Sequence, residues 1–193
     1  AAPDLGSGVV RRVGSSPISR TKNKLEAFKI LSWRLFNWLD MKKHQLCCIG
    51  HITLDKVVTP QNTVYMPGGT AFYCSHAIRH FNDIDYALVT AVGATEMNVV
   101  EQLREMGIHV TALPSKYSVY FENIYGANPD DRTQRVLAKA DPFIAGQLKD
   151  IDAQIYHLGS LLADDFSLEV IKELSQRGLI AVDSQGYLRE VRD

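Results

Sequence analysis

The sequence predicts an α/β protein with a mostly parallel sheet, and three observations support this. Short apolar runs that end at glycine or a polar residue recur along the chain, as is typical of buried strands. Segments with helical apolar spacing separate most of these runs, and such alternation implies parallel pairing through right-handed crossovers. A single hairpin interrupts the alternation. The expected strands are 46–49, 57–66 with a turn at 60–62, 86–92, 108–113, 155–158 and 179–183.

Three helices and the hairpin complete the expected elements. Gly107 and Gly178 follow the second and third helices in the capping position that favours glycine. The hairpin surrounds a polar turn at 126–131. The expected helices are 70–81, 97–106 and 166–177, and the hairpin strands are 118–125 and 133–139.

Composition limits the classes of function. The net charge of −1 over 193 residues gives no sign of a protein that binds nucleic acid. Cys47, Cys48 and Cys74 form an odd, unevenly spaced set, so we expect buried reduced thiols and not a disulfide framework. Reduced thiols are typical of a reducing compartment, which predicts a cytoplasmic protein.

The first forty residues differ from the rest of the chain. Residues 1–40 carry seven Lys or Arg against three Asp or Glu. We expect disorder over 1–24 and a short amphipathic helix over 25–39, which is too short to span a bilayer. An organelle transit peptide, a helix lying on a membrane surface and a non-native extension ahead of Met41 are all compatible with this pattern. Two regions are therefore expected, 1–40 and 41–193.

A glycine pair and an aspartate provide the candidate binding residues. Gly68 and Gly69 open a helix, so the backbone can lie close to a ligand and the first helical amides point outward as donors. Asp55 follows the first apolar strand, at the edge of a parallel sheet where ligands bind. A carboxylate and free amides suit the hydroxyl groups of a sugar.

Five segments in this order resemble the ribokinase/PfkB-like carbohydrate kinases. They cover about 41–193, and the resemblance implies a ribokinase-like fold with a small β-hairpin lid at about 117–140. The segments are Gly-His-Ile-Thr-Leu-Asp at 50–55, Gly-Gly-Thr-Ala-Phe-Tyr at 68–73, Val-Gly at 92–93, Tyr-His-Leu-Gly-Ser at 156–160 and Ala-Val-Asp-Ser-Gln-Gly-Tyr-Leu-Arg at 181–189.

The resemblance also implies what the chain does and what it lacks. The family phosphorylates a hydroxyl of a small sugar, polyol or nucleoside with ATP and Mg²⁺. Its Gly-Ala-Gly-Asp motif is not in this sequence. We therefore expect the N-terminal part of a kinase, truncated at the C-terminus, with no catalytic residue of its own and no activity in isolation. The alternative is a non-catalytic module for sugar binding or dimerisation.

The predicted substrate-binding residues come from the glycine segment, the aspartate and the lid. The lid implies a possible homodimer, and the sequence predicts neither a metal site nor a membrane-spanning segment. A metal site at His76 and His80 lacks a third ligand nearby. The predicted substrate-binding residues are Asp55, Gly68, Gly69, Thr70, Tyr73, Asn123 and Arg135.

Three positions depart from the ribokinase pattern. Tyr73 stands where that pattern has asparagine, and Thr95 and Asn98 replace the usual Asp and Gly. The glycine segment is closer to that of kinases of polyols such as inositol.

Overall fold

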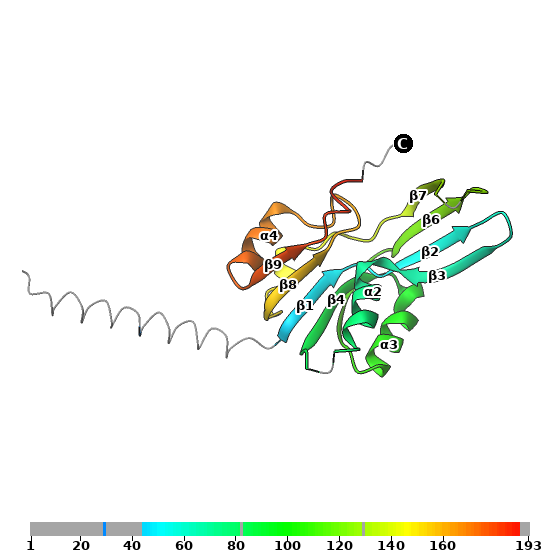
Figure 1. Cartoon of the computed structure of the whole chain (residues 1–193). Helices are drawn as coiled ribbons and strands as arrows, with labels where there is room; N and C mark the ends of the chain where they lie inside the picture. Colours follow the sequence, from blue (N-terminus) through cyan, green and yellow to red (C-terminus); the bar gives the residue numbers. More distant parts are fainter. Residues whose placement is uncertain (1–28, 30–43, 82, 129, 190–193) are drawn as a thin grey trace, which may run out of the picture. The chain divides into compact units, whose positions relative to one another are not determined.

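A computed structural model describes residues 29, 44–81, 83–128 and 130–189 of the chain. The expectations for 1–40 lie, apart from position 29, outside the described residues. Two β-sheets, called sheet A and sheet B below, form the framework of the described chain, and Figure 1 shows sheet B extending from one end of sheet A. Among the described residues, no helix has the length and apolar character needed to cross a membrane.

Sheet A contains five parallel strands in the order β5-β4-β1-β8-β9. Its central strands are mostly apolar because helices cover both faces of the sheet. The chain builds the sheet outward from β1 in one direction and then returns to build it in the other. The bounds are β1 His44–Gly50, β4 Tyr86–Val92, β5 His109–Pro114, β8 Ala153–Gly159 and β9 Leu179–Val182.

Three α-helices cover sheet A (Figure 1). Helices α2 (Gly69–Ile78) and α3 (Met97–Glu105) pack on one face, and α4 (Leu168–Ser175) packs on the other. The Ser167 side chain caps α4 by accepting a hydrogen bond from the backbone N–H of Val170. Two single-turn 3₁₀ helices cover Ala94–Glu96 and Ala145–Gln147.

The adjacent cysteines of β1 belong to different halves of the core. Cys47 packs with the side chains under α4, and Cys48 packs with those under α2 and α3, because neighbouring side chains on a strand face opposite ways. All three cysteines are free, as predicted. Cys74, on α2, is only half-buried, so the expectation of full burial is wrong for this thiol.

Sheet B contains four strands in the order β3-β2-β6-β7. It consists of two antiparallel hairpins joined by parallel pairing of β2 with β6. The predicted lid hairpin is therefore half of a larger sheet, whose other half comes from the segment expected at 57–66. The bounds are β2 Thr53–Val58, β3 Thr63–Gly68, β6 Val119–Tyr125 and β7 Arg132–Ala138.

The structure confirms the predicted α/β class and mostly parallel sheet. Each expected helix and strand is present, with ends that differ by a few residues. The main difference concerns Asp55, which was expected directly after the first strand and lies inside β2 of sheet B. The chain passes from sheet A to sheet B at His51 and Ile52, both fully buried.

Candidate functional site

The candidate site lies where the strand order of sheet A reverses. β1 pairs with β4 on one side and with β8 on the other, and Gly50 and Gly159 are register partners at the carboxyl ends of β1 and β8. In open α/β sheets, ligands bind beyond the carboxyl ends of the strands at such a reversal. Here the same edge is also where sheet B begins.

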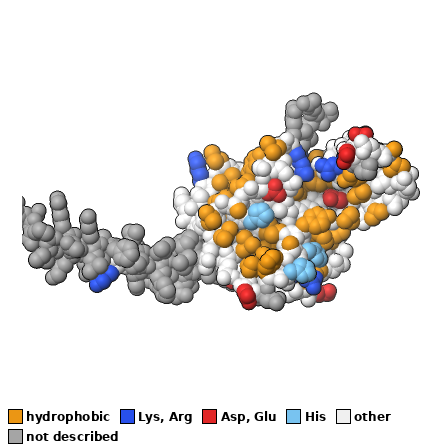
Figure 2. All heavy atoms as spheres, viewed as in Figure 1, with side chains coloured by type: hydrophobic (Ala, Val, Ile, Leu, Met, Phe, Trp, Pro, Cys, Tyr) orange, Lys and Arg blue, Asp and Glu red, His pale blue; other side chains and the backbone are white. Residues whose placement is uncertain are grey.

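A cavity of about 760 Å³ opens at this junction. The volume falls within the roughly 300–1,000 Å³ that is typical of small-molecule sites. Viewed from the same side as Figure 1, hydrophobic side chains gather on the surface around α2 and along sheet B (Figure 2). The cavity is lined by Asp55, Val57, Met66, Gly69, Thr70, Tyr73, Cys74, Ala77, Phe121, Asn123, Tyr125, Arg132, Gln134, His157, Leu161, Gln185 and Arg189.

The Asp55 carboxylate lies against the glycine pair. A side chain on Gly68 would collide with this carboxylate and with the Thr53 hydroxyl. Gly69 has a φ of +87°, and a side chain there would collide with the backbone carbonyl of His51. Glycine is therefore required at 69 for both its conformation and its space.

Asp55 is half-buried at the cavity wall. Its Oδ1 accepts a hydrogen bond of 2.8 Å from the Thr53 hydroxyl. Burial raises the pKa of Asp55, while Thr53 and the positive charges of Arg189 and Arg132 act in the opposite direction. The cavity thus holds a partly desolvated carboxylate acceptor with two guanidinium groups nearby.

A closed set of hydrogen bonds fixes the start of α2 to the end of sheet A. Thr70 Oγ1 donates to Asp183 Oδ2 at 3.0 Å, and Gln185 Nε2 donates to the same carboxylate oxygen at 2.9 Å. Gln185 Nε2 also donates a hydrogen bond of 3.0 Å to Thr70 Oγ1. Because Thr70 and Gln185 both line the cavity, these bonds set the shape of its wall.

Arg189 closes the cavity from the segment that follows β9. Its Nη1 donates to the carbonyl oxygen of Leu161 at 2.8 Å, and its guanidinium lies 5.3 Å from the centre of the Phe121 ring. Burial lowers the pKa of Arg189, although a guanidinium stays charged at neutral pH. Arg189 therefore offers a fixed positive charge beside Asp55.

The two faces of sheet B carry different chemistry. Asn123 and Gln134 are register partners on β6 and β7, and both line the cavity, with Gln134 Nε2 donating to Asn123 Oδ1 at 2.8 Å. Lys56, Glu122 and Arg135 are register partners one position along. Because strand side chains alternate, this second set lies on the opposite face.

An ion-pair set occupies that opposite face. Lys56 Nζ lies 2.8 Å from Glu122 Oε1, and Arg135 Nη1 lies 3.4 Å from Glu122 Oε2. Contact with Lys56 lowers the pKa of Glu122. Arg135 is thus turned toward Glu122 and away from the cavity.

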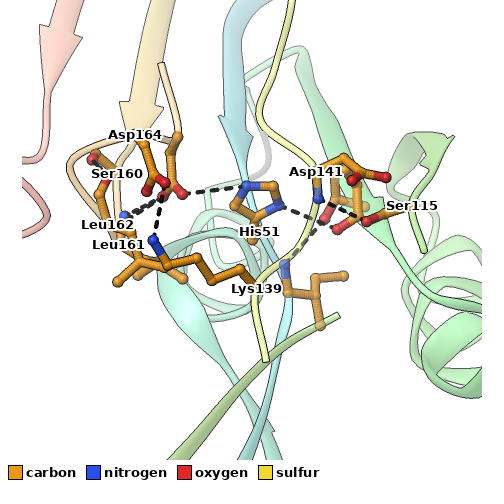
Figure 3. A network of polar contacts seen from close by, with 12 residues as sticks. His51, Ser115, Lys139, Asp141, Ser160, Leu161, Leu162 and Asp164 are labelled. Atoms are coloured by element: carbon orange, nitrogen blue, oxygen red, sulfur yellow. Dashed lines mark hydrogen bonds and ion pairs between the residues drawn. The ribbon is translucent and has the colours of Figure 1, made fainter. Parts of the chain in front are cut away.

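A buried polar network holds the loop beyond β8 against the junction of the two sheets (Figure 3). Asp165 Oδ2 accepts backbone hydrogen bonds from Leu161 at 2.7 Å and from Leu162 at 3.0 Å. The fully buried His51 ring lies between this loop and β4: its Nδ1 is 3.2 Å from the carbonyl oxygen of Ala91, and its Nε2 is 3.6 Å from Asp165 Oδ1. Burial lowers the pKa of His51, and the Asp165 charge opposes this.

Two further contacts tie down the segment around His51. Lys139 Nζ lies 3.0 Å from Asp164 Oδ2, and the Ser115 hydroxyl accepts a hydrogen bond of 2.8 Å from the backbone N–H of Asp141 (Figure 3). The network therefore joins the ends of β5, β7 and β8 around the β1–β2 connection. It positions Leu161, which lines the cavity.

A thiol and an imidazole form one wall of the cavity. Cys74 Sγ lies 3.9 Å from His157 Nδ1, and both residues line the cavity. Contact with the Cys48 thiol lowers the pKa of Cys74 to about 5, and the same contact raises the pKa of Cys48. Contact with Cys74 raises the pKa of His157.

The structure brings most of the predicted substrate-binding residues together. Gly68 lies directly beneath the Asp55 carboxylate, and Arg135 is not among the cavity-lining residues because strand alternation turns it to the other face. Five of the predicted residues line the cavity: Asp55, Gly69, Thr70, Tyr73 and Asn123.

Sequence reasoning did not identify several groups at the cavity. Cys74 and His157 are in contact although 83 positions separate them in the sequence. Gln185 and Thr70 are hydrogen-bonded across a separation of 115 positions. No local motif signals such pairs. Each of His157, Gln185 and Arg189 does lie in a segment quoted above for the family resemblance, 156–160 or 181–189, so these segments were a usable signal for site residues.

The one close cluster of metal-ligand side chains among the described residues does not suit magnesium. Among them, the one group of three or more His, Cys, Asp or Glu ligands close enough to share an ion is Cys48, Cys74 and His157. Magnesium requires oxygen ligands, so this set does not suit it.

Comparison with solved structures identifies the type of fold. A pyrophosphate-dependent kinase in the ribokinase family matches with a TM-score of 0.66 and 25% identity, over 77% of this chain and 53% of that one. The fold is ribokinase-like. The sequence itself matches no protein-family model and no curated protein.

Two further kinases share the ribokinase-like fold. A Burkholderia thailandensis nucleoside kinase in complex with inosine matches at TM-score 0.58 and 18% identity, covering 74% of this chain and 53% of that one. Phosphofructokinase-2 from Escherichia coli in complex with fructose-6-phosphate matches with a TM-score of 0.54 and 17% identity, covering 72% of this chain and 55% of that one. The chain therefore spans about half the length of the ribokinase-like structures it matches.

Proposed function

We propose that this chain forms the acceptor-binding part of a ribokinase-like kinase that phosphorylates a hydroxyl of a small polyol, sugar or nucleoside. The observation that carries the proposal is the position of Asp55, whose carboxylate lies against the Gly68–Gly69 turn and lines the cavity. A carboxylate that is already partly desolvated accepts a hydrogen bond from a substrate hydroxyl at little further cost.

The polar groups around Asp55 support a hydroxyl-rich acceptor. Asn123, Gln134 and Gln185 add amide donors and acceptors to the same cavity, and Tyr73 adds an aromatic ring that is 53% exposed. Amides and a carboxylate form directional hydrogen bonds with several hydroxyls at once. Arg132 and Arg189 would suit an acceptor that also carries a phosphate.

Calorimetry with a panel of acceptors tests the site. The panel contains myo-inositol, inosine and fructose-6-phosphate, because solved ribokinase-like structures contain these compounds. Asp55→Asn keeps the shape of the side chain and removes its charge. We expect binding to weaken by roughly 1.5–3 kcal/mol, or about 10- to 150-fold.

Glu122→Gln is the matched control, since it changes a carboxylate on the opposite face of the neighbouring strand. It should leave acceptor affinity unchanged. An Asp55→Asn variant that binds every acceptor of the panel as tightly as the wild type would remove Asp55 from the site.

We further propose that phosphoryl transfer requires residues that this chain does not contain. A positioned general base contributes roughly 10²- to 10⁴-fold to rate and one anion-hole donor roughly 10²- to 10³-fold. The Gly-Ala-Gly-Asp sequence that supplies both in the family is missing here. The 193-residue chain should therefore transfer no phosphoryl group from ATP or pyrophosphate to any acceptor it binds.

Two observations separate a kinase part from a binding module. Measurable transfer by the purified chain would contradict the assignment of catalysis to other residues. Reading the coding sequence beyond Asp193 addresses the alternative: a downstream Gly-Ala-Gly-Asp supports the kinase, and a stop codon supports a module that binds without catalysis.

A further inference from the structure

Three side chains with soft ligand atoms converge beneath the cavity. Cys48 on β1 and His157 on β8 are register partners, so both lie on the same face of sheet A. Helix α2 covers this face and carries Cys74. One ligand atom from each of the three residues lies within 4.8 Å of the others.

These spacings are close to those of a tetrahedral zinc site. Zinc binds cysteine sulfur at about 2.3 Å and histidine nitrogen at about 2.0–2.1 Å, which places two ligand atoms about 3.5–3.8 Å apart. Cys74 Sγ and His157 Nδ1 are already 3.9 Å apart. Small side-chain rotations would close the rest of the set, because every separation is within 4.8 Å, which is about 1 Å above the ideal value.

The burial of the three residues leaves one side of the set open. Cys48 is fully buried, whereas Cys74 and His157 line the cavity. Two cysteines and one histidine with an open fourth position form a known zinc ligand set. The fourth position would be reached from the cavity.

The hydroxyl group of Tyr86 is a candidate outer partner of the two cysteine ligands. The Tyr86 hydroxyl interacts with both Cys48 and Cys74, and it is held by a 2.9 Å hydrogen bond with the Ser75 hydroxyl. Outer partners of this kind orient metal ligands.

We propose that Cys48, Cys74 and His157 bind one Zn²⁺ ion whose fourth coordination position opens into the cavity. This site is distinct from any magnesium site of phosphoryl transfer, since Mg²⁺ does not favour thiolates. The inference stands independently of the proposed kinase function, because a metal titration requires no acceptor.

Competition between the reduced, metal-free chain and a chromophoric chelator measures zinc binding. We expect one Zn²⁺ per chain, and Co²⁺ in its place should give thiolate-to-metal absorption. Cys74→Ser and His157→Gln should each weaken binding by more than the roughly 10- to 100-fold that the loss of an outer partner costs. Tyr86→Phe should fall within that range.

Cys47→Ala is the matched control, because Cys47 neighbours Cys48 in sequence but packs on the other face of sheet A. His76→Gln is a second control, because His76 lies on α2 but outside the ligand set. Both variants should bind zinc as the wild type does. Unchanged zinc affinity in Cys74→Ser, or cobalt binding without thiolate absorption, would overturn the proposal.

A second measurement on the wild-type chain guards against variants that do not fold. Zinc should slow the alkylation of Cys74 by iodoacetamide, located by mass spectrometry of the digested protein. Alkylation of Cys74 at the same rate with and without saturating zinc would also overturn the proposal.

Discussion

Sheet A and sheet B differ in how much of each strand is buried. All seven residues of β4 in sheet A are buried, whereas none of the seven residues of β7 in sheet B is. Helices cover both faces of sheet A, while sheet B lines the cavity with one face and carries ion pairs on the other. Sheet A thus accounts for most of the core, and sheet B contributes polar side chains to the site.

This difference divides the cavity into two kinds of wall. The wall from sheet A and α2 depends on close backbone approach at Gly69 and on buried packing. The wall from sheet B depends on strand alternation alone, which decides whether a polar side chain faces the ligand or solvent. Substitutions at Gly69 and in the packing beneath it should affect stability, and substitutions of the cavity-facing side chains of sheet B should affect binding.

The largest expected effect compares matched leucines in the two sheets. Leu88 in β4 is fully buried, whereas Leu137 in β7 is 49% exposed. Leu88→Ala should lower the free energy of unfolding by about 2–5 kcal/mol because it leaves a cavity in the core. Leu137→Ala should change it by less than about 0.5 kcal/mol. Urea denaturation measures both, and equal losses would contradict the division between the sheets.

The next largest effect concerns the backbone at Gly69, in the wall formed by sheet A and α2. Gly69→Ala should lower the free energy of unfolding by about 1–3 kcal/mol, since alanine is strained at a φ of +87° and its Cβ would meet the His51 carbonyl. Gly107→Ala is the control, because Gly107 has a φ of +84° with nothing within 4 Å of the added atom. The difference between the two losses, measured in urea, isolates the collision. A loss at Gly69 no larger than at Gly107 would show that the close approach is unimportant.

A smaller effect tests the alternation of sheet B. Arg132 lines the cavity, and Arg135 lies on the opposite face. Arg132→Ala should weaken binding of the best acceptor in the panel by about 1 kcal/mol, or about fivefold, through the loss of a hydrogen-bond donor. Arg135→Ala should leave the affinity unchanged. Calorimetry that gives the reverse order would restore Arg135 as a binding residue and reject the register.

The smallest expected change in stability comes from the titration of Asp55. Burial raises the pKa of Asp55 above its ordinary value of 3.8, so the folded chain holds this proton more tightly than the unfolded chain does. Its contribution to stability is therefore present below pH 3.8 and is lost as the pH rises through the folded-state pKa. Acceptor binding needs the charged form and should change in the opposite direction, weakening as the pH falls through the same window.

Asp55→Asn provides the comparison for both pH series. The variant should lack the wild-type pH dependence of acceptor affinity in this window, and urea denaturation at each pH should show a smaller slope of stability against pH. Identical pH profiles in the wild type and the variant would show that Asp55 does not titrate at the site.

The order of helices and strands could be predicted because the relevant signals are local. The apolar run of β4 was located at its observed bounds, and Gly107 marked the end of α3, since burial and capping leave their pattern within a few residues. Sheet B was harder to predict. The 57–66 segment was expected as extended chain, but its pairing with β6 depends on a strand more than sixty positions away.

The sequence by itself determined the α/β class and the glycine pair, because strand periodicity and glycine conformation are properties of short segments. The pairing of β2 with β3 put Asp55 against Gly68. The tertiary structure alone decided which side chains face the cavity, turning Arg132 toward it and Arg135 away, and bringing Cys48, Cys74 and His157 together. The reason is physical: strand register and sheet order set these contacts, and both arise from pairing between segments that are far apart in the chain.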